Sequence, residues 1–394
     1  MGTDNHPRIR YGMIGGGPGA FIGAVHRAAA ALDGEFELVA GAFSVSEEKS
    51  RRQGRELNLV DARVSGSWTD MLEKEAARPD GERMQAVVIV TPNALHYEMA
   101  RRALEKGFDV ICDKPMTTTL EEAEALCRAV RDTGRVFVLT HNYTGYPMVK
   151  EARERVQAGD LGPVRKVVVE YTQGWLATRL EATGNKQASW RSNPALAGIS
   201  SALGDIGTHG ENLARYVTGL EMESLMADLG TMVEGRDLED DAALFIRYEG
   251  GARGLMHVSQ VAAGEENNLS LRIYGERAAL IWRQEAPNEL RMLHAEGPER
   301  VLRRGNAYLS AAAQAAGRIP PGHPEGFIEA FANIYRAAAA AIRTRGAVAA
   351  PEGTLVPVDA PTVQDGARGV HFIHTAVRSS RERAWVDARY EPPR

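Results

Sequence analysis

Apolar segments and amphipathic segments alternate along the first 140 residues of the chain. Short apolar runs bounded by glycine, proline or polar residues predict strands, and the alanine-rich or charged stretches between them predict helices. The run Ala86–Val90 is apolar throughout, as in strands that are buried on both faces. Strands are predicted at 8–14, 36–43, 86–90, 108–112 and 136–140, and helices at 21–32, 47–57, 96–106 and 120–133. This alternation predicts an α/β fold with a parallel, doubly wound sheet and right-handed crossovers.

The hydrophobic pattern changes beyond residue 150. Apolar and polar residues alternate there, which is typical of antiparallel strands with one covered face. Strands are predicted at 164–171, 242–248, 252–261 and 269–274, helices from near 205, at 325–343 and at 367–381, an irregular loop at 173–203, and a Pro/Gly-rich return segment at 351–366. We therefore expect a second, α+β domain with an open, largely antiparallel sheet. The predicted domains are 1–145 and 146–394, with the last helix packing back on the first domain.

The bulk composition narrows the classes of function. A chain of 394 residues is long enough for two domains. Its net charge is −5 and it has no basic block, so the charge pattern does not indicate binding to nucleic acid or to an anionic membrane surface. The first ten residues are polar, and no stretch approaches the roughly 20 apolar residues of a membrane span. The two cysteines, Cys112 and Cys127, fall in a predicted strand and a predicted helix, so we expect both to be reduced in a cytoplasmic protein.

A glycine-rich run separates the first predicted strand from the first predicted helix; its residues are Gly15, Gly16, Gly17, Pro18, Gly19 and Ala20. Glycines at this position allow a backbone approach to a pyrophosphate, and the helix N-terminus supplies free N–H groups. The first two glycine places of a dinucleotide site fit Gly15 and Gly17, and the third falls on Ala20 or, with an insertion, on Gly23. The alternative is a glycine-rich turn without a ligand.

The second predicted strand lacks the acidic residue that usually binds the ribose of NAD. Ser44 or Ser46 could instead bind a ribose hydroxyl or a phosphate. We expect NAD as the cofactor, and NADP stays open.

Two further runs carry candidate chemistry. Asp113, Lys114 and Pro115 follow a predicted buried strand, where a lysine is costly unless it meets a partner or a ligand. Asp205 and His209 are four residues apart, so one helix face carries both. A histidine is the usual general base for an alcohol near neutral pH. The plainer alternatives are a solvated strand-end lysine, a helix N-cap and a core histidine. No His/Cys cluster has the spacing of a metal site.

Taken together, four ordered motifs resemble the glucose-fructose oxidoreductase/inositol dehydrogenase (Gfo/Idh/MocA) family over nearly the whole chain. They are the glycine loop, Thr91-Pro92-Asn93 with His96, Asp113-Lys114-Pro115, and the helix with Asp205 and His209. The family usually has Glu where this chain has Asp113. The resemblance implies an N-terminal Rossmann domain, a bound nicotinamide cofactor, and a C-terminal sheet that is often used for dimer or tetramer contacts.

The resemblance also implies roles for individual residues. Lys114 would hydrogen-bond the reacting oxygen and help relay its proton, His209 would be the acid/base, and Asp205 would hold the substrate or His209. The cofactor would be lined by Thr91, Pro92, Asn93, His96, Asp113, Lys114, Asn142, Trp190 and Arg191.

For the substrate, Tyr143, Tyr146 and Trp175 offer flat surfaces for a sugar ring. Lys186 and Arg191 could accept an anionic group, since arginine binds carboxylate, phosphate or sulfonate in a bidentate way; the alternative is a surface loop with solvated charges. The hypothesis is a pyranose or cyclitol, with or without an anionic substituent.

Three functions stay open. The first is an NAD(P)-dependent dehydrogenase that acts on a ring hydroxyl of a sugar or cyclitol. The second is an NAD-dependent glycosidase that oxidises its substrate transiently and recycles NAD, for example on a sulfoquinovoside. The third is a non-catalytic dinucleotide-binding regulator, against which the presence of Lys114, Asp205 and His209 argues.

Overall fold

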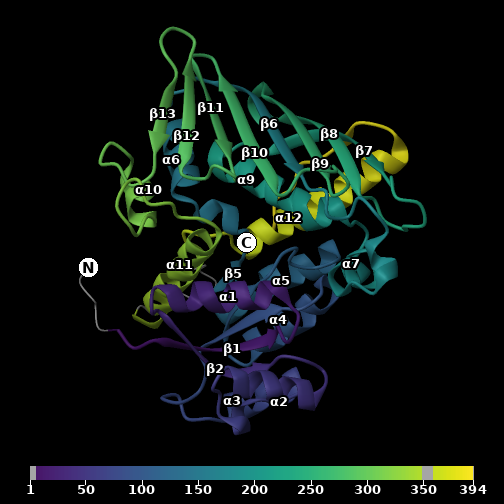
Figure 1. The fold of residues 1–394 in the computed structure, drawn as a ribbon, viewed down its shortest axis with the longest axis vertical. Helices are drawn as coiled ribbons and strands as arrows, with labels where there is room; N and C mark the ends of the chain where they lie inside the picture. Colours follow the sequence, from purple (N-terminus) through teal and green to yellow (C-terminus); the bar gives the residue numbers. More distant parts are fainter. Residues whose placement is uncertain (1–5, 348–357, 394) are drawn as a thin grey trace.

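The computed structural model describes residues 6–347 and 358–393, which form two sheets with helices between and around them (Figure 1). The first sheet has five parallel strands in the order β2-β1-β3-β4-β5, as the alternation predicted. Its elements are β1 (Ile9–Gly15), α1 (Phe21–Leu32), β2 (Phe36–Ala42), α2 (Glu47–Glu56), α3 (Trp68–Ala76), β3 (Ala86–Val90), α4 (His96–Glu105), β4 (Asp109–Cys112), α5 (Leu120–Thr133) and β5 (Phe137–Leu139). The doubly wound α/β prediction is confirmed.

Local sequence explains most of these boundaries. Every residue of β3 is buried, in keeping with its uninterrupted apolar run. The Thr119 side chain caps α5 at its start, and Gly134 ends that helix in the left-handed conformation at φ 60°. Helix α3 was not predicted, because its residues are mostly polar and only Met71, Leu72 and Glu75 are buried.

The second sheet has nine strands in the order β13-β12-β11-β10-β6-β9-β8-β7-β14. All neighbours are antiparallel except β6 and β9, which confirms the largely antiparallel prediction. The strands are β6 (Val164–Thr172), β7 (Met222–Gly230), β8 (Asp241–Tyr248), β9 (Arg253–Ser259), β10 (Asn268–Gly275), β11 (Ala278–Arg283), β12 (Glu289–His294), β13 (Arg300–Arg303) and β14 (Val386–Asp387). The helices are α6 (Pro147–Gln157), α7 (Lys186–Arg191), α8 (Pro194–Ala197), α9 (Thr208–Thr218), α10 (Ala311–Ala316), α11 (Phe327–Ala347) and α12 (Val363–Glu382).

One face of this second sheet is covered and the other is open. Burial alternates strictly along β8, where Leu244 and Ile246 are buried and Phe245 between them is exposed. Helices α6, α9 and α12 lie against the covered face, between the two sheets (Figure 1). The period of two gives this sheet one apolar face, and α9 packs on that face against β6 and β10.

The two long C-terminal helices join the two parts of the molecule. Helix α11 packs on α1, and its Phe331 and Tyr335 belong to the same core cluster as the residues of β1. Helix α12 contacts α5 at one end and β7 at the other, with Val370 in the core of the first sheet and Phe372 in the core of the second. It begins at Val363, four residues before the predicted start. Of the predicted return segment, residues 351–357 lie outside the described part of the chain.

The prediction of an irregular loop over 173–203 is wrong in part. This segment contains a short turn of 3₁₀ helix (Leu180–Thr183) and the helices α7 and α8. The Asn185 side chain accepts hydrogen bonds from the Gln187 and Ala188 N–H groups and so caps α7, and Asn193 with Pro194 starts α8 in the same way. The helices are too short to show an apolar period in the sequence.

No helix within residues 6–347 and 358–393 is long and apolar enough to cross a membrane. Cys112 and Cys127 are free thiols and both are buried. Within the same ranges, no group of three His, Cys, Asp or Glu side chains could hold a metal ion.

Candidate active site

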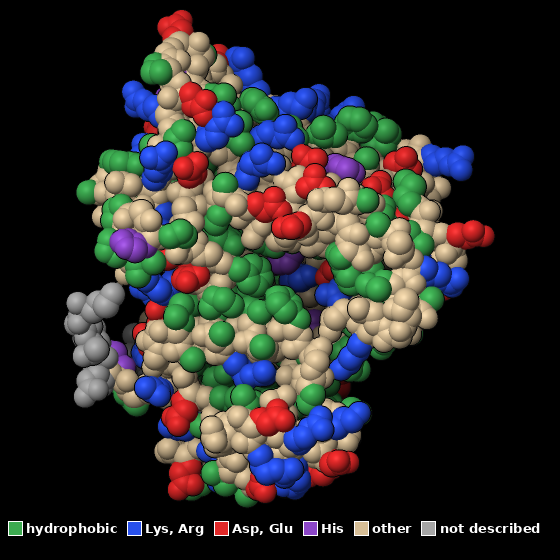
Figure 2. Space-filling view, in the orientation of Figure 1, with side chains coloured by type: hydrophobic (Ala, Val, Ile, Leu, Met, Phe, Trp, Pro, Cys, Tyr) green, Lys and Arg blue, Asp and Glu red, His purple; other side chains and the backbone are tan. Residues whose placement is uncertain are grey.

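A cavity of about 730 Å³ lies at the carboxyl ends of the parallel strands, beneath the second sheet. This is the edge at which open α/β sheets bind ligands. On the face seen in Figure 2 the surface is hollowed between the two halves of the molecule, and basic and histidine side chains lie inside the hollow. The glycine loop, Lys114, Asp205 and His209 all line the cavity, so the structure brings the predicted motifs together.

The glycine loop has the geometry that a dinucleotide requires. Gly15 has φ +86°, and a Cβ on Gly17 would lie 2.4 Å from the Phe43 carbonyl oxygen. A Cβ on Gly23 would lie 2.4 Å from the Gly16 Cα, so Gly23, rather than Ala20, takes the place where the helix packs closely on the loop. No side chain caps the start of α1, which leaves its first N–H groups for a ligand. These residues fit NAD. Pro18 and Gly19 lie in the turn and do not line the cavity.

The end of β2 forms a second part of the cavity. Ser44, Val45, Gly66 and Trp68 line it, and Val45 is 98% exposed. The Ser44 hydroxyl accepts a hydrogen bond from the Ser46 N–H group at 3.2 Å. Ser46 itself caps α2 and is absent from the lining. Ser44 is therefore the better placed of the two serines to meet a ribose.

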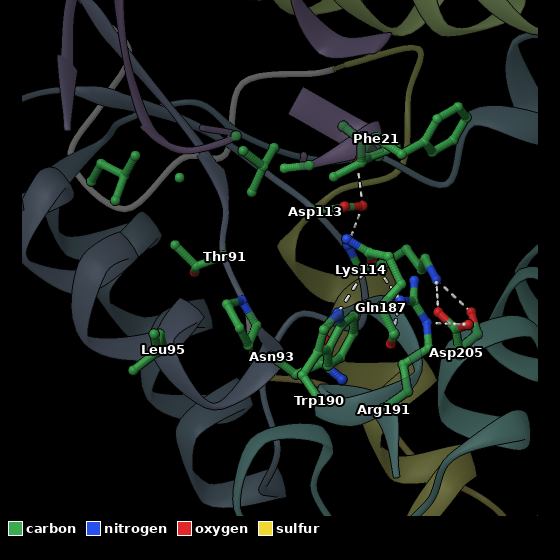
Figure 3. A pocket seen from close by; sticks show the side chains of 18 of the residues that line it. Phe21, Thr91, Asn93, Leu95, Asp113, Lys114, Gln187, Trp190, Arg191 and Asp205 are labelled. Carbon is green, nitrogen blue, oxygen red and sulfur yellow. Dashed lines mark hydrogen bonds and ion pairs between the residues drawn. The ribbon is translucent and has the colours of Figure 1, made fainter. Parts of the chain in front are cut away.

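Lys114 reaches across from the first sheet to the turn before α9 (Figure 3). Its ammonium donates to the Asp205 carboxylate, with Nζ–Oδ1 at 2.9 Å, and to the Asp205 backbone carbonyl. The Asp113 carboxylate accepts hydrogen bonds from the Lys114 N–H group at 2.9 Å and from the Thr140 hydroxyl at 3.1 Å, which fixes the turn. The Lys114 side chain is 13% exposed. It is therefore a paired, largely buried lysine rather than a solvated one.

Three donors surround the Asp205 carboxylate. Besides Lys114, Arg191 Nε donates to Oδ2 at 2.8 Å and Gln260 Nε2 donates to the same oxygen at 2.9 Å. Burial raises the pKa of Asp205, but the charges of Arg191 and Lys114 outweigh it and hold the pKa well below its usual range. The residue lies within a π turn, Leu203–Gly207, and does not cap α9. Asp205 is therefore a permanently ionised anchor.

His209 lies one turn further along and is 7% exposed. Its Nδ1 is 3.3 Å from Nδ1 of His141, and the Tyr143 ring packs edge-on against it with the ring centroids 4.8 Å apart. Burial lowers the pKa of His209 well below its ordinary value, and the nearby charge of Lys114 lowers it further. The imidazole is therefore neutral at physiological pH and able to accept a proton.

The remaining predicted residues divide between the cavity and its supports. Thr91, Pro92, Asn93, Asn142, Lys186 and Trp190 line the cavity. His96 is fully buried behind it, with Nδ1 2.9 Å from the Pro115 oxygen and Nε2 2.8 Å from the Thr91 oxygen. Tyr146 stacks behind Tyr143, and Trp175 packs outside on the guanidinium of Arg191. His96, Tyr146 and Trp175 thus support the site instead of lining it.

Sequence reasoning missed a group of uncharged side chains on the second sheet's side of the cavity, which we call the neutral wall: Tyr143, Tyr171, Gln173, Asn267 and Gln284. Of these only Tyr143 was singled out. The Tyr143 and Tyr171 hydroxyls are 2.6 Å apart, and Asn267 Oδ1 accepts from Tyr171 at 2.9 Å and from Gln173 at 2.7 Å. Tyr171, Gln173 and Asn267 lie at or next to the ends of β6 and β10, which was the one signal available in the sequence, and the pairing of these strands brings them together. Tyr143 reaches them from the turn after β5.

Comparison with known proteins gives the same architecture. Residues 9–141 match the model of an oxidoreductase family with an NAD-binding Rossmann fold, and residues 149–281 match the GFO/IDH/MocA C-terminal domain. The chain belongs to the Gfo/Idh/MocA family. A relative from Bacillus subtilis (strain 168), the oxidoreductase YfiI, is 33% identical over 383 residues, which is 96% of each chain.

Two solved Gfo/Idh/MocA structures cover almost the whole chain. An inositol dehydrogenase homolog from Azotobacter vinelandii, complexed with NADH and myo-inositol, is 37% identical with a TM-score of 0.89 and covers 96% of this chain and 97% of its own. Levoglucosan dehydrogenase in complex with NADH and levoglucosan is 27% identical with a TM-score of 0.80 and covers 97% of this chain and 99% of its own. The protein is thus an oxidoreductase with an NAD-binding Rossmann domain.

Proposed function

We propose that this oxidoreductase oxidises a ring hydroxyl of an uncharged sugar or cyclitol and passes the hydride to NAD. The observation that carries the proposal is the meeting of Lys114, ionised Asp205 and neutral His209 in the cavity that the glycine loop also lines. The relatives in complex with myo-inositol and with levoglucosan support this substrate class, because both ligands are uncharged. Bound NAD supplies the hydride acceptor.

Lys114 is arranged to bind the reacting oxygen. An ammonium has three N–H donors, and Asp205 takes two of them, through Oδ1 and through its backbone carbonyl. Because Lys114 lines the cavity, its third N–H is left to donate to a substrate hydroxyl. Asp205 fixes the direction of the ammonium group, so charge that develops on the substrate oxygen meets an oriented donor.

His209 is arranged to take the proton. Its Nδ1 is occupied by His141, so Nε2 is the ring nitrogen that remains for the cavity. Asp205 does not compete for the proton, because three donors saturate its carboxylate and hold its pKa low. The hydroxyl proton therefore passes to His209 while the hydride leaves the carbon that carries this hydroxyl.

The walls of the cavity favour an uncharged ring. The neutral wall offers hydroxyl and amide groups that can exchange hydrogen bonds with ring hydroxyls. Arg191, the strongest candidate for an anion, is already paired with Asp205 at 2.8 Å and packs on the Trp190 ring at 4.2 Å. An anionic substituent would have to rely on the exposed Lys186.

A substrate screen tests the proposal. The protein is mixed with NAD or NADP and with sugars, cyclitols, sugar phosphates and aryl glycosides, while NADH absorbance and aglycone release are followed together. We expect NADH to accumulate with an uncharged ring substrate and the signal to disappear in His209→Gln. Aglycone release without net NADH would replace the proposal by the recycling glycosidase. Tight NAD binding without turnover of any compound would favour the regulator.

The open face of the nine-stranded sheet leads us to propose a homodimer or homotetramer in a cytoplasmic enzyme. Phe245 and Tyr274 are exposed on this face, and Arg247 packs over the Trp385 ring with its guanidinium 4.2 Å from the centroid. A second copy of the chain packed on this face would bury these side chains. Light scattering of wild type and Phe245→Glu tests this, and a monomeric wild type would contradict it.

A further inference from the structure

The proposed proton acceptor, His209, has a buried partner, His141. The two Nδ1 atoms are 3.3 Å apart, and the rings are nearly perpendicular at 82° with centroids 5.1 Å apart. His141 is 2% exposed and does not line the cavity. It lies two residues after β5, at the carboxyl end of that strand, whereas His209 belongs to α9. One imidazole therefore lies against the back of the other.

Both rings are neutral in the folded protein. Burial lowers the pKa of His141 to about 3, and Lys114 lowers it further. A neutral imidazole has one N–H and one bare nitrogen. In a contact between two Nδ1 atoms, one must donate and the other must accept, so the tautomers of the two rings are linked.

The two alternatives have opposite consequences. If His141 Nδ1 carries the hydrogen, the proton of His209 is on Nε2, and the nitrogen that faces the cavity cannot accept another. If His209 Nδ1 carries it, His209 Nε2 is bare and can take the proton from a substrate hydroxyl. Only the second arrangement supports oxidation.

We propose that His141 is a positioning residue that accepts a hydrogen bond from His209 Nδ1 and thereby holds His209 in the base-competent tautomer. The inference rests on the proposed role of His209 as proton acceptor. It gives His141 the part that a carboxylate has in a Ser-His-Asp triad, orienting the imidazole and fixing its tautomer. Unlike a carboxylate, a neutral histidine adds no charge to the site, so His209 keeps its lowered pKa.

The backbone holds His141 in place for this role. Its N–H donates to the Leu139 carbonyl at 3.0 Å, and its own carbonyl accepts from the Thr144 hydroxyl at 3.0 Å. Arg215 and Asp365 act on its titration from the far side and are paired with each other at 2.9 Å.

His209 is held from the other sides. The charges that act on it are Lys114 and Asp205, and the rings of Tyr143 and Tyr171 pack against it. Lys114 and Asp205 are themselves paired, so neither histidine faces an unopposed carboxylate that would keep it charged.

A spectroscopic test reads the tautomers directly in the unmodified enzyme. In ¹⁵N spectra of histidine-labelled protein, a ring nitrogen that carries hydrogen is resolved from a bare one, and His209→Gln and His141→Asn assign the two residues. We expect His209 to carry its hydrogen on Nδ1 and His141 on Nε2. The reverse pair of tautomers would overturn the proposal.

Kinetics then compares two substitutions at position 141. In His141→Leu no acceptor remains, and we expect kcat for oxidation to fall by about tenfold or more across the plateau between roughly pH 6 and 8. In His141→Asn the amide oxygen stands near the former Nδ1, and we expect most of kcat to return. NADH affinity, followed by cofactor fluorescence, should be unchanged in both. Equal activities of the two variants would overturn the proposal.

The outcome for the proposed function is separate. If His209→Gln oxidises the substrate as fast as wild type, His209 is not the proton acceptor and the proposed function fails, even where the ¹⁵N spectra show the expected tautomers. If His209→Gln is inactive and His141→Leu is as active as His141→Asn, the proposed function stands and the role of His141 fails.

Discussion

The two ends of the cavity are built on different principles. At the glycine-loop end, the groups available to the dinucleotide are backbone N–H groups and the apolar, exposed side chains of Phe21 and Val45. At the catalytic end they are buried, paired side chains: Lys114 on Asp205, and His209 on His141. Backbone groups depend on chain geometry, whereas the buried pairs depend on the residue itself. The first end therefore depends on the glycines that shape the backbone, and the second depends on particular side chains.

The largest effect is expected from Lys114→Met at the catalytic end. The substitution removes the donor to the substrate oxygen and leaves Asp205 ionised beside it, so kcat should fall by about 100- to 1000-fold. NADH affinity, measured by fluorescence titration, should change little if the two ends are independent. Lys106→Met removes a lysine from an ion pair with Glu73 at the surface and serves as the control, with activity unchanged. A Lys114→Met enzyme with full activity would contradict the mechanism.

The glycine-loop end should respond in the opposite way. A Cβ in Gly17→Ala would lie 2.4 Å from the Phe43 backbone oxygen, which no side-chain rotation relieves. We expect the Kd for NADH to rise by about tenfold or more, equivalent to roughly 1.4 kcal/mol, with kcat at saturating NAD close to that of wild type.

Gly81→Ala is the matched control for this change, because nothing lies within 4 Å of its Cβ. A loss of kcat in Gly17→Ala without a loss of NADH affinity would break the proposed division between the two ends.

Stability against acid provides a third comparison between the cofactor side and the catalytic end. Burial lowers the pKa of His26, on α1, to about 4 and that of His141 to about 3, whereas an unfolded histidine titrates near 6.5. Below this value the unfolded chain thus binds more protons than the folded protein. The stability that the neutral histidines contribute is therefore fully present above pH 6.5 and is lost as the pH falls. At pH 5 each of these two histidines should lower the free energy of unfolding by on the order of 2 kcal/mol.

Urea unfolding at pH 7 and pH 5 measures this loss. In His141→Asn the free energy of unfolding should fall less between pH 7 and pH 5 than in wild type. The difference should equal the contribution of one histidine, on the order of 2 kcal/mol. An unchanged loss would mean that His141 is already charged in the folded protein.

Most of the fold could be predicted because its signals are local. The uninterrupted apolar run of β3 and the alternation in β8 each reflect one element and its burial. Helices α7 and α8 were not predicted, because helices of six and four residues are too short to show a hydrophobic period. They depend on the caps Asn185 and Asn193.

Within the candidate site, Lys114, Asp205 and His209 were recognisable as motifs, but their partners were not. The contacts from Gln260 and Arg191 to Asp205, and from His141 to His209, join segments that are 14 to 68 residues apart. No periodicity in the chain encodes such a contact. Arg191 shows the consequence: its residue type indicated an anion site, yet the structure pairs it with Asp205 inside the protein.

The smallest effect is expected at Lys186, which also lines the cavity. The side chain is exposed, so a charge there contributes little in water. Lys186→Ala should raise the KM for an uncharged ring substrate by less than about fivefold, and should raise the KM for its phosphorylated counterpart by the same factor. Steady-state kinetics with glucose and glucose 6-phosphate, or with the best pair from the screen, measures both. A selective loss for the phosphate ester would make Lys186 an anion-binding residue, and the neutral wall alone would no longer define the substrate class.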